Sequence, residues 1–175
     1  MPDFYLQAWL RTNRDRAESA LALIESCDIK GVARLISVNA LAGHHGVKVG
    51  MTVAQAQAIF DCTEIVTRCV QAESNALAVL SDALWGRSPQ VKVCREQAGW
   101  AYVGASGLQR LFGQIADWAQ AIFNDLNSLG LASVIGIAPG WQQARLLALA
   151  GGGMLQDARS ADKLSRFPCA VLEPS

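Results

Sequence analysis

Two adjacent histidines, His44 and His45, are the side chains whose type best suits metal binding or proton transfer. Neighbouring residues on a helix point in different directions, and no nearby cysteine or carboxylate completes a recognisable ligand set. The cysteines form no Cys-x-x-Cys pair of the kind that indicates zinc or a redox dithiol; they are Cys27, Cys62, Cys69, Cys94 and Cys169. The sequence therefore predicts surface histidines, reduced and mostly buried thiols, no metal site and no cofactor.

A local cluster of basic residues suits contact with phosphate, because phosphate contacts dominate non-specific affinity for DNA. It consists of Arg11, Arg14 and Arg16, for which a solvated loop face is the alternative interpretation. Tryptophans are a second candidate, since bases stack on aromatic rings; they are Trp9, Trp85, Trp100, Trp118 and Trp141. Trp118 falls on the apolar side of a predicted helix, which favours a place in the core.

The composition is that of a folded chain, with 51% hydrophobic and 17% charged residues over 175 positions. Lys plus Arg and Asp plus Glu number 15 each, so net charge supplies no field that steers the whole chain toward nucleic acid. The chain opens with no charged and then apolar leader, and it contains no apolar run of about 18 residues. We therefore expect a soluble, cytoplasmic protein.

The elements that position these residues alternate between short strands and helices. Apolar spacing predicts a helix near Phe4–Leu10, a hairpin of the segments 20–25 and 33–38, and helices over 39–43, 53–60 and 72–85. Gly46 and Gly50 permit tight turns before Thr52, which caps the next helix. The second half predicts paired strands over 91–94 and 101–103, a helix from Leu108 to Leu129 ended by Gly130, a strand over 133–137 and a helix over 141–150. This order predicts an α+β fold.

Several short motifs follow one another in order. They are Ser37-Val38-Asn39-Ala40, Gly46-Val47-Lys48-Val49-Gly50-Met51, Arg87-Ser88-Pro89, Leu108-x-x-Leu111-Phe112-Gly113 and Val134-Ile135-Gly136-Ile137-Ala138. Together they resemble the N-terminal part of Y-family translesion DNA polymerases, and most closely the ImuB-type mutagenesis proteins. The resemblance implies a ferredoxin-like polymerase palm over residues 1–175, with a small helical and hairpin fingers insertion over 20–85.

The resemblance also implies where catalytic groups belong. Polymerases hold two metal ions with carboxylates, and the family's first Asp maps before Met1, while its later Asp-Glu pair maps onto Gly99 and Trp100. The family's fingers Tyr and Arg map onto Ala40 and Gly43, and its Lys after the last palm strand maps near Trp141. We therefore expect these five positions to be vacated, with Trp100 and Trp141 filling the emptied pocket. Asp3 is expected to be a helix N-cap or surface residue.

The missing groups lead to the expectation that the chain is not an enzyme but a non-catalytic accessory or scaffold in DNA repair or SOS-type translesion mutagenesis. The alternatives are a truncated translesion polymerase and a weak DNA-binding module. The resemblance implies a bacterial protein, associated with the nucleoid at most, whose partners are a RecA-like accessory, a replicative-type polymerase and a sliding clamp. Gln109-Arg110-Leu111-Phe112 resembles part of a clamp-docking peptide, but the predicted helix favours Leu111 and Phe112 in the core.

Overall fold

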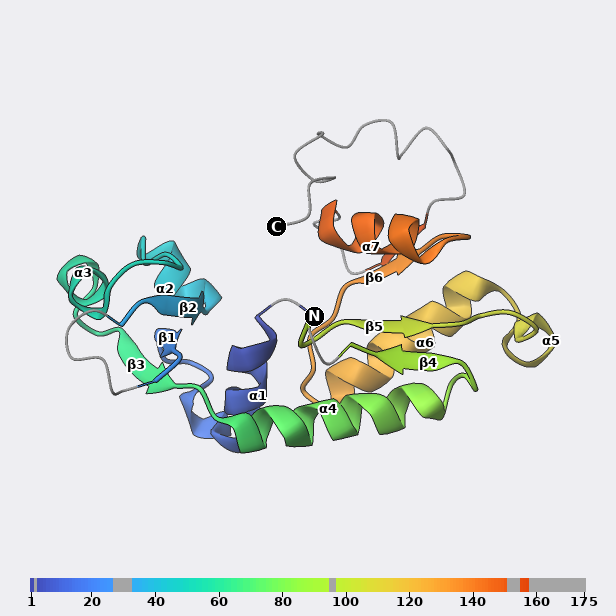
Figure 1. The fold of residues 1–175 in the computed structure, drawn as a ribbon, viewed down its shortest axis with the longest axis horizontal. Coiled ribbons are helices and arrows are strands. Elements are labelled where there is room, and N and C mark those ends of the chain that lie inside the picture. The colour runs from blue at the N-terminus through green and yellow to red at the C-terminus, as the bar shows by residue number, and fades with distance from the viewer. Residues whose placement is uncertain (2, 27–32, 95–96, 151–154, 158–175) are drawn as a thin grey trace. The chain divides into compact units, whose positions relative to one another are not determined.

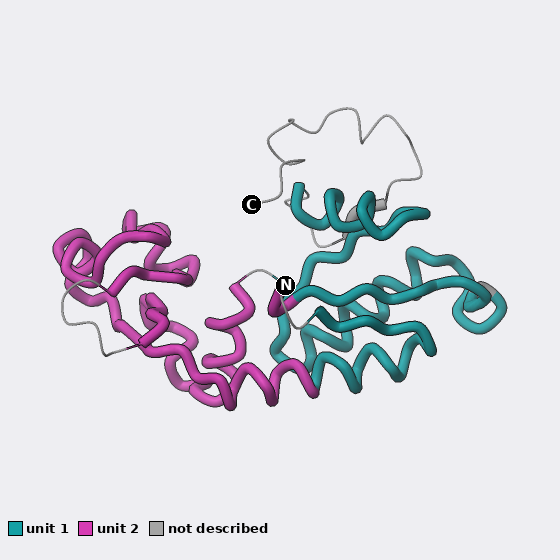
Figure 2. Tube along the Cα trace, in the orientation of Figure 1, with its two compact units in different colours: residues 1–2, 79–96, 100–175 teal, residues 3–78, 97–99 magenta. Residues whose placement is uncertain are grey.

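The computed structural model describes residues 1, 3–26, 33–94, 97–150 and 155–157, and the chain divides into two compact units (Figures 1 and 2). Unit 1 contains residues 1–2, 79–96 and 100–175, and unit 2 contains residues 3–78 and 97–99. Most of the segment expected to form a fingers-like insertion therefore belongs to unit 2. Within the described residues, no helix is both long and apolar enough to cross a membrane.

Unit 2 is built on a three-stranded sheet with the order β2–β1–β3. The central strand β1 (Leu21–Ile24) pairs antiparallel with β2 (Leu35–Val38) and parallel with β3 (Glu64–Thr67). All four residues of β1 are buried, as expected for a strand that is covered on both faces. The predicted hairpin is confirmed, although its connection over 27–32 lies outside the described residues. The sequence pattern does not predict β3.

Helices cover both faces of this sheet. Successive side chains of β1 point to opposite faces, and each set packs against different helices. Ala22 and Ile24 share an apolar cluster with α2 (Ala40–His44) and α3 (Val53–Ile59). On the other face Leu21 and Leu23 pack with residues of α1 (Phe4–Thr12), which is followed by the short 3-10 helix η1 (Arg14–Arg16). Two apolar clusters of the described residues of unit 2 therefore lie on opposite faces of its sheet.

The turn between α2 and α3 confirms the glycine and capping predictions. Gly46 and Gly50 have φ values of +90° and +87°, which favour glycine because it lacks a Cβ. Thr52 then forms a capping box: its Oγ1 accepts from the Gln55 N–H at 3.2 Å, and Gln55 Oε1 accepts from the Thr52 N–H at 2.9 Å. These contacts fix where α3 begins.

Asn39 is the N-cap of α2 and also fastens the sheet. Its Oδ1 accepts from the backbone N–H groups of Ala42 and Leu21, each at 3.0 Å. Its Nδ2 donates to the Ser19 carbonyl oxygen at 2.7 Å. One side chain therefore satisfies groups from a helix, a strand and the loop before that strand.

An arginine at the end of β3 links three further elements of unit 2. Arg68 Nε and Nη2 donate to the buried Glu73 carboxylate at 2.6 and 2.8 Å, and Nη1 donates to Glu25 at 2.8 Å. The guanidinium carbon lies 4.3 Å from the Tyr5 ring centroid. Donation of these hydrogen bonds to Glu73 raises the pKa of Arg68. Desolvation opposes this effect and the negative charge of Glu73 adds to it, so the cation persists at all accessible pH values.

Unit 1 contains helices, an antiparallel hairpin and a parallel strand pair. The C-terminal part of α4 (Val70–Trp85) lies in this unit with α5 (Gln109–Phe112), α6 (Ile115–Ser128) and α7 (Trp141–Ala150). The hairpin is β4 (Val91–Val93) with β5 (Ala101–Val103), and the parallel pair is β6 (Ile135–Ile137) with β7 (Leu155–Asp157). Buried residues of α4 and α6, including Leu80, Leu84, Ile122 and Leu126, contribute to its core. The hairpin and the helix over 141–150 confirm the predictions.

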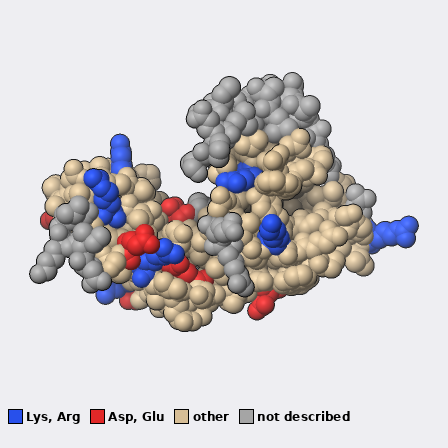
Figure 3. All heavy atoms as spheres, viewed as in Figure 1, with Lys and Arg blue, Asp and Glu red and all other residues tan. Residues whose placement is uncertain are grey.

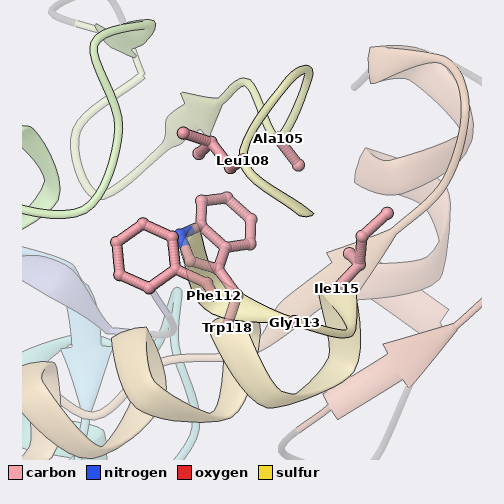
Figure 4. Close-up of a pocket in the computed structure, with 6 residues that line it drawn as sticks. All are labelled: Ala105, Leu108, Phe112, Gly113, Ile115 and Trp118. Atoms are coloured by element: carbon pink, nitrogen blue, oxygen red, sulfur yellow. The ribbon is translucent and has the colours of Figure 1, made fainter. Parts of the chain in front are cut away.

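The long helix predicted from Leu108 to Leu129 is wrong in one respect, because the structure has α5 and α6 on either side of Gly113 at φ +74°. Leu111 is 75% exposed, so its predicted place in the core is also wrong. Phe112 is half-buried and faces a small apolar hollow with Leu108 and Trp118 (Figure 4). This hollow has a volume of about 10 Å³, the lower limit for holding one water, so it cannot hold a nucleotide.

The Arg87-Ser88 motif fastens the hairpin to α6. The Ser88 hydroxyl donates to the Gly104 carbonyl oxygen at 2.6 Å and accepts from the Gln90 N–H at 3.0 Å. Trp118 Nε1 donates to the Arg87 carbonyl oxygen at 3.0 Å, and the Arg87 guanidinium pairs with Asp125 at 2.7 and 3.0 Å. Trp118 is buried, which confirms its predicted place in the core.

Replacing Ser88 by alanine is expected to lower the free energy of unfolding of unit 1 by about 1 to 3 kcal/mol. Ser88 is buried, so the change leaves two backbone groups without their partner. Urea unfolding followed by tryptophan fluorescence measures the loss. Ser106→Ala is the matched control, because Ser106 is exposed and should change stability by less than about 0.5 kcal/mol. Equal stability of the two variants would contradict the role of the Ser88 bonds.

Candidate nucleic-acid interface

The β4–β5 hairpin places its polar and aromatic side chains on one face. Lys92 lies directly opposite Tyr102, whereas Val91 pairs with Val103 and Val93 with Ala101. The Cys94 N–H donates to the Trp100 carbonyl oxygen at 2.8 Å, which continues the ladder by one pair. Because side chains alternate along a strand, Trp100 and Tyr102 share a face with Lys92. The opposite face consists of Val91, Val93, Ala101 and Val103.

Helix α7 brings two more side chains to this face. Trp141 and Arg145 are four residues apart and so project from the same side of the helix. The Trp141 ring meets the Tyr102 ring edge-on, with centroids 5.8 Å apart and planes at 84°. The Arg145 guanidinium carbon lies 5.1 Å from the Trp100 ring centroid. Two ring contacts therefore connect α7 to the hairpin.

Charges in the described part of unit 1 are segregated by element. The cations Lys92, Arg110 and Arg145 lie on β4, α5 and α7, and the described residues of 88–94, 100–116 and 132–150 contain no Asp or Glu. The carboxylates Asp82, Asp117 and Asp125 lie on α4 and α6. Figure 3 shows isolated blue side chains over the region of α5, α7 and the hairpin. The hairpin and α7 therefore present net positive charge beside exposed aromatic surface.

Among the described cations of unit 1, Arg87, which follows α4, has its charge balanced by a carboxylate of α6. Arg87 makes its two hydrogen bonds to Asp125, and the pKa of Arg87 is raised chiefly by these bonds, against a smaller effect of desolvation. Among the described residues, the cations of the hairpin and of α7 are Lys92 and Arg145, and Arg110 lies on α5. Such a combination of cations and aromatic rings suits nucleic acid, because cations bind phosphates and rings stack on bases.

The family model described as the impB/mucB/samB family matches residues 1–148, which is most of the chain. The chain belongs to the impB/mucB/samB family. The match spans the described strands and helices of both units up to α7. A search among curated proteins finds no significant match.

Solved structures similar to this impB/mucB/samB chain are DNA polymerases. The insertion ternary complex of Dbh DNA polymerase aligns with a TM-score of 0.77 and 19% identity, over 92% of this chain and 47% of that one. DinB from Sulfolobus solfataricus aligns with a TM-score of 0.76 and 18% identity, over 92% of this chain and 47% of that one. A Y-family DNA polymerase chimera built on Dbh aligns with a TM-score of 0.75 and 15% identity, over 93% of this chain and 48% of that one. The chain thus spans about half the length of these polymerases. The predicted α+β palm and fingers fold is confirmed.

The family match corrects the expectation that the chain is not an enzyme. That expectation is wrong, because the impB/mucB/samB match and the likeness to Y-family DNA polymerases point to an enzyme family of nucleotidyltransferases. The chain is Y-family translesion polymerase-like over the part of those polymerases that it covers. The assignment of Gly99 and Trp100 to the positions of the catalytic acids stays a prediction and does not decide activity.

The positions expected to be vacated lie in different surroundings. Gly99 is buried at φ +84°, and Trp100 is half-buried beneath Arg145. Trp141 is 59% exposed, so the expectation that it fills a closed pocket is wrong. Its position at the first turn of α7, just after β6 and a Pro-Gly turn, leaves the indole at the surface. Ala40 and Gly43 lie on the exposed side of α2.

Neither histidine meets another metal-ligating group. The His45 ring stacks on Phe60 with centroids 3.9 Å apart and planes at 5°, and His44 is exposed, which confirms the predicted surface position of both. In the part of the chain that the structure describes, no three His, Cys, Asp or Glu side chains gather as a metal-binding group. Asp3 occupies the N-cap position of α1 at φ +46° without capping it, and its carboxylate accepts from the Ser37 hydroxyl at 3.1 Å.

The described cysteines are free, as predicted, but their burial was predicted wrongly. Cys62 and Cys69 are exposed and Cys94 is half-buried. A hydrogen bond to Asp61 raises the pKa of the Cys62 thiol. Cys27 and Cys169 lie outside the described residues.

The basic cluster near η1 is only partly available for phosphate. Arg16 pairs with Asp15 at 3.2 Å and Glu64 at 3.1 Å, and these carboxylates offset its positive charge. Arg14 is exposed and Arg11 is half-buried. DNA contact by Arg11, Arg14 and Arg16 stays a prediction. The stronger candidate surface combines Trp141, which the sequence already offered as a stacking residue, with Tyr102, which it did not, because their contact depends on α7 packing beside the hairpin.

Proposed function

We propose that this chain acts in the tolerance of DNA damage, as the palm and fingers part of a Y-family translesion polymerase-like protein that engages primed DNA. The observation that carries this proposal is the impB/mucB/samB match over residues 1–148. The alternative of a truncated translesion polymerase is compatible with it, and the ImuB-type and SOS assignments are finer versions of the same proposal.

The charge distribution supports a DNA contact despite a net charge of zero. A uniformly neutral surface would give no phosphate affinity, but here Lys92, Arg110 and Arg145 lie on elements of unit 1 without carboxylates. Each neutralised phosphate releases counterions, so binding through these cations must weaken as salt rises. Three duplex phosphate contacts predict a slope of about −2.7 in a plot of log K against log salt.

Fluorescence anisotropy of a labelled primer–template, titrated with the chain at several salt concentrations, tests the proposal. We expect saturable binding with the slope given above, and a smaller slope after Lys92→Ala. The exposed Lys48 of unit 2 supplies the control, since Lys48→Ala should leave the slope of a contact made by unit 1 unchanged. Absence of binding to primed DNA, or binding that salt does not affect, would overturn the proposed function.

A second proposal concerns a protein partner and rests on the exposure of Leu111. Its neighbour Phe112 is half-buried, so the one-turn helix α5 offers a leucine to solvent in the sequence Gln109-Arg110-Leu111-Phe112. A sliding clamp is the partner whose apolar pocket takes Leu and Phe side chains of this kind. A RecA-like accessory and a replicative-type polymerase are the other partners proposed for the same complex.

Calorimetric titration of the chain with the sliding clamp tests the second proposal. Removing a leucine from an apolar pocket costs about 1.5 to 3 kcal/mol, so Leu111→Ala should weaken binding by roughly 10- to 100-fold. Val70→Ala is the matched control, because Val70 is 68% exposed on another helix. Unchanged affinity in Leu111→Ala would exclude α5 as the docking element.

A further inference from the structure

Helix α7 carries a row of side chains that the described residues of its unit leave partly exposed. Trp141, Arg145 and Leu149 follow at intervals of four residues and so lie along one side of the helix. Trp141 is 59% exposed and Leu149 is 53% exposed, while Arg145 is half-buried over Trp100. The exposed indole therefore offers apolar ring surface, the burial of which by a ligand would be favourable.

The indole of Trp141 is nevertheless held in place. Tyr102 meets it edge-on at a centroid distance of 5.8 Å, and Tyr102 is itself fixed by the β4–β5 ladder opposite Lys92. An aromatic platform that is already positioned loses little side-chain entropy when a flat ligand stacks on it. The exposed part of the ring is therefore suited to a planar π system.

The charges around this platform select the class of ligand. Lys92 and Arg145 flank the two ring contacts, and the described residues of the hairpin and α7 carry no carboxylate. Together with Arg110, these cations come from three separate elements, β4, α5 and α7, which suits a chain of spaced phosphates better than one compact triphosphate. A base attached to a phosphate backbone satisfies both the ring and the cations.

Stacking on the Trp141 indole would also distinguish single-stranded DNA from duplex DNA. The faces of paired bases are covered by their neighbours, so a duplex offers phosphates to the cations but no open base face to an indole. An unpaired base has a free face, and stacking on an aromatic side chain contributes about 1 to 3 kcal/mol. We propose that an unpaired base of single-stranded DNA stacks on Trp141, while Lys92 and Arg145 bind phosphates of the same strand. This inference rests on the proposed role at DNA and specifies which strand unit 1 contacts.

The test compares a labelled oligothymidylate with an abasic strand of the same length, which has the same phosphates and no bases. Trp141→Ala should weaken binding of the oligothymidylate by about 5- to 150-fold and leave the abasic strand unaffected. Trp141→Phe should retain most of the affinity, and Lys92→Ala should reduce the salt slope by about 0.7. Trp85→Ala is the matched control, because Trp85 is 53% exposed on α4 and should have no effect.

Equal losses for both strands, or an unchanged affinity of Trp141→Ala for the oligothymidylate, would overturn the inference. Competition by free thymidine triphosphate as strong as that by the strand would also overturn it, in favour of a nucleotide site, and competition by an acidic peptide alone would favour a protein. The primer–template assay is independent of this comparison of two strands. Absence of binding in the primer–template assay would contradict the proposed function. Intact primer–template binding without base-dependent binding would contradict only the inference about Trp141.

Discussion

Gly136→Ala is expected to lower the free energy of unfolding of unit 1 by about 3 kcal/mol, at the upper end of the range for overpacked sites. A Cβ at this position would overlap the Ala144 carbonyl oxygen and lie 2.9 Å from the Ala148 backbone nitrogen. These are backbone atoms of α7, so no rotamer change relieves the overlap, and the helix must move away from β6. Thermal unfolding should show the loss as a shift of roughly 6 to 12 °C.

Gly43→Ala provides the matched control for this substitution. Gly43 lies within α2, and nothing is found within 4 Å of a Cβ built there. Because alanine favours helix over glycine, this variant should be unchanged or up to about 1 kcal/mol more stable. Unchanged stability of Gly136→Ala would show that β6 and α7 are not packed as closely as the structure has them. Displacement of α7 should also alter the fluorescence of Trp141.

Asn39→Ala is expected to lower the stability of unit 2 by about 2 to 4 kcal/mol. Loss of an N-cap costs about 1 kcal/mol, and leaving the Leu21 N–H and the Ser19 carbonyl without their partner adds about 1 to 3 kcal/mol. Chemical unfolding monitored by circular dichroism measures the loss.

Asn39→Asp tests which of these bonds matters. It keeps both accepting interactions but removes the donor to Ser19, so its stability should fall between those of the wild type and Asn39→Ala. Asn75→Ala is the control on an exposed helical surface, with an expected change below about 0.5 kcal/mol. If Asn39→Ala matched that control, the side chain would not fasten the sheet.

Local patterns were sufficient to predict most of the elements. Thr52 with Gln55 marks the start of α3 by capping chemistry that needs no distant partner. The segment Glu64–Thr67 shows why β3 could not be predicted in the same way: it has only one fully buried side chain, Val66, and becomes a strand through pairing with β1. Gly113, at positive φ, follows the end of α5 within an otherwise helical pattern, and Leu111 of this short helix is exposed.

The candidate site was harder to predict than the fold. Trp100 and Trp141 could be singled out from their places in the resemblance, but their roles depend on tertiary contacts with Arg145 and Tyr102. Arg14 and Arg16 form a cluster in the sequence, yet the carboxylate of Glu64 on a distant strand offsets the positive charge of Arg16. Sequence spacing therefore finds candidate residues, whereas neutralisation and exposure are decided by packing.

The central position of β1 has a consequence for folding while the chain is being synthesised. Its antiparallel neighbour β2 follows soon along the chain, so this hairpin can form by local closure, whereas the parallel neighbour β3 is synthesised only after α2 and α3. At typical translation rates the interval is on the order of seconds. Throughout that interval the free edge of an entirely apolar strand is open to pairing with the wrong chain. Mispairing at β1 is therefore a risk until residue 67 has left the ribosome and β3 can pair with it.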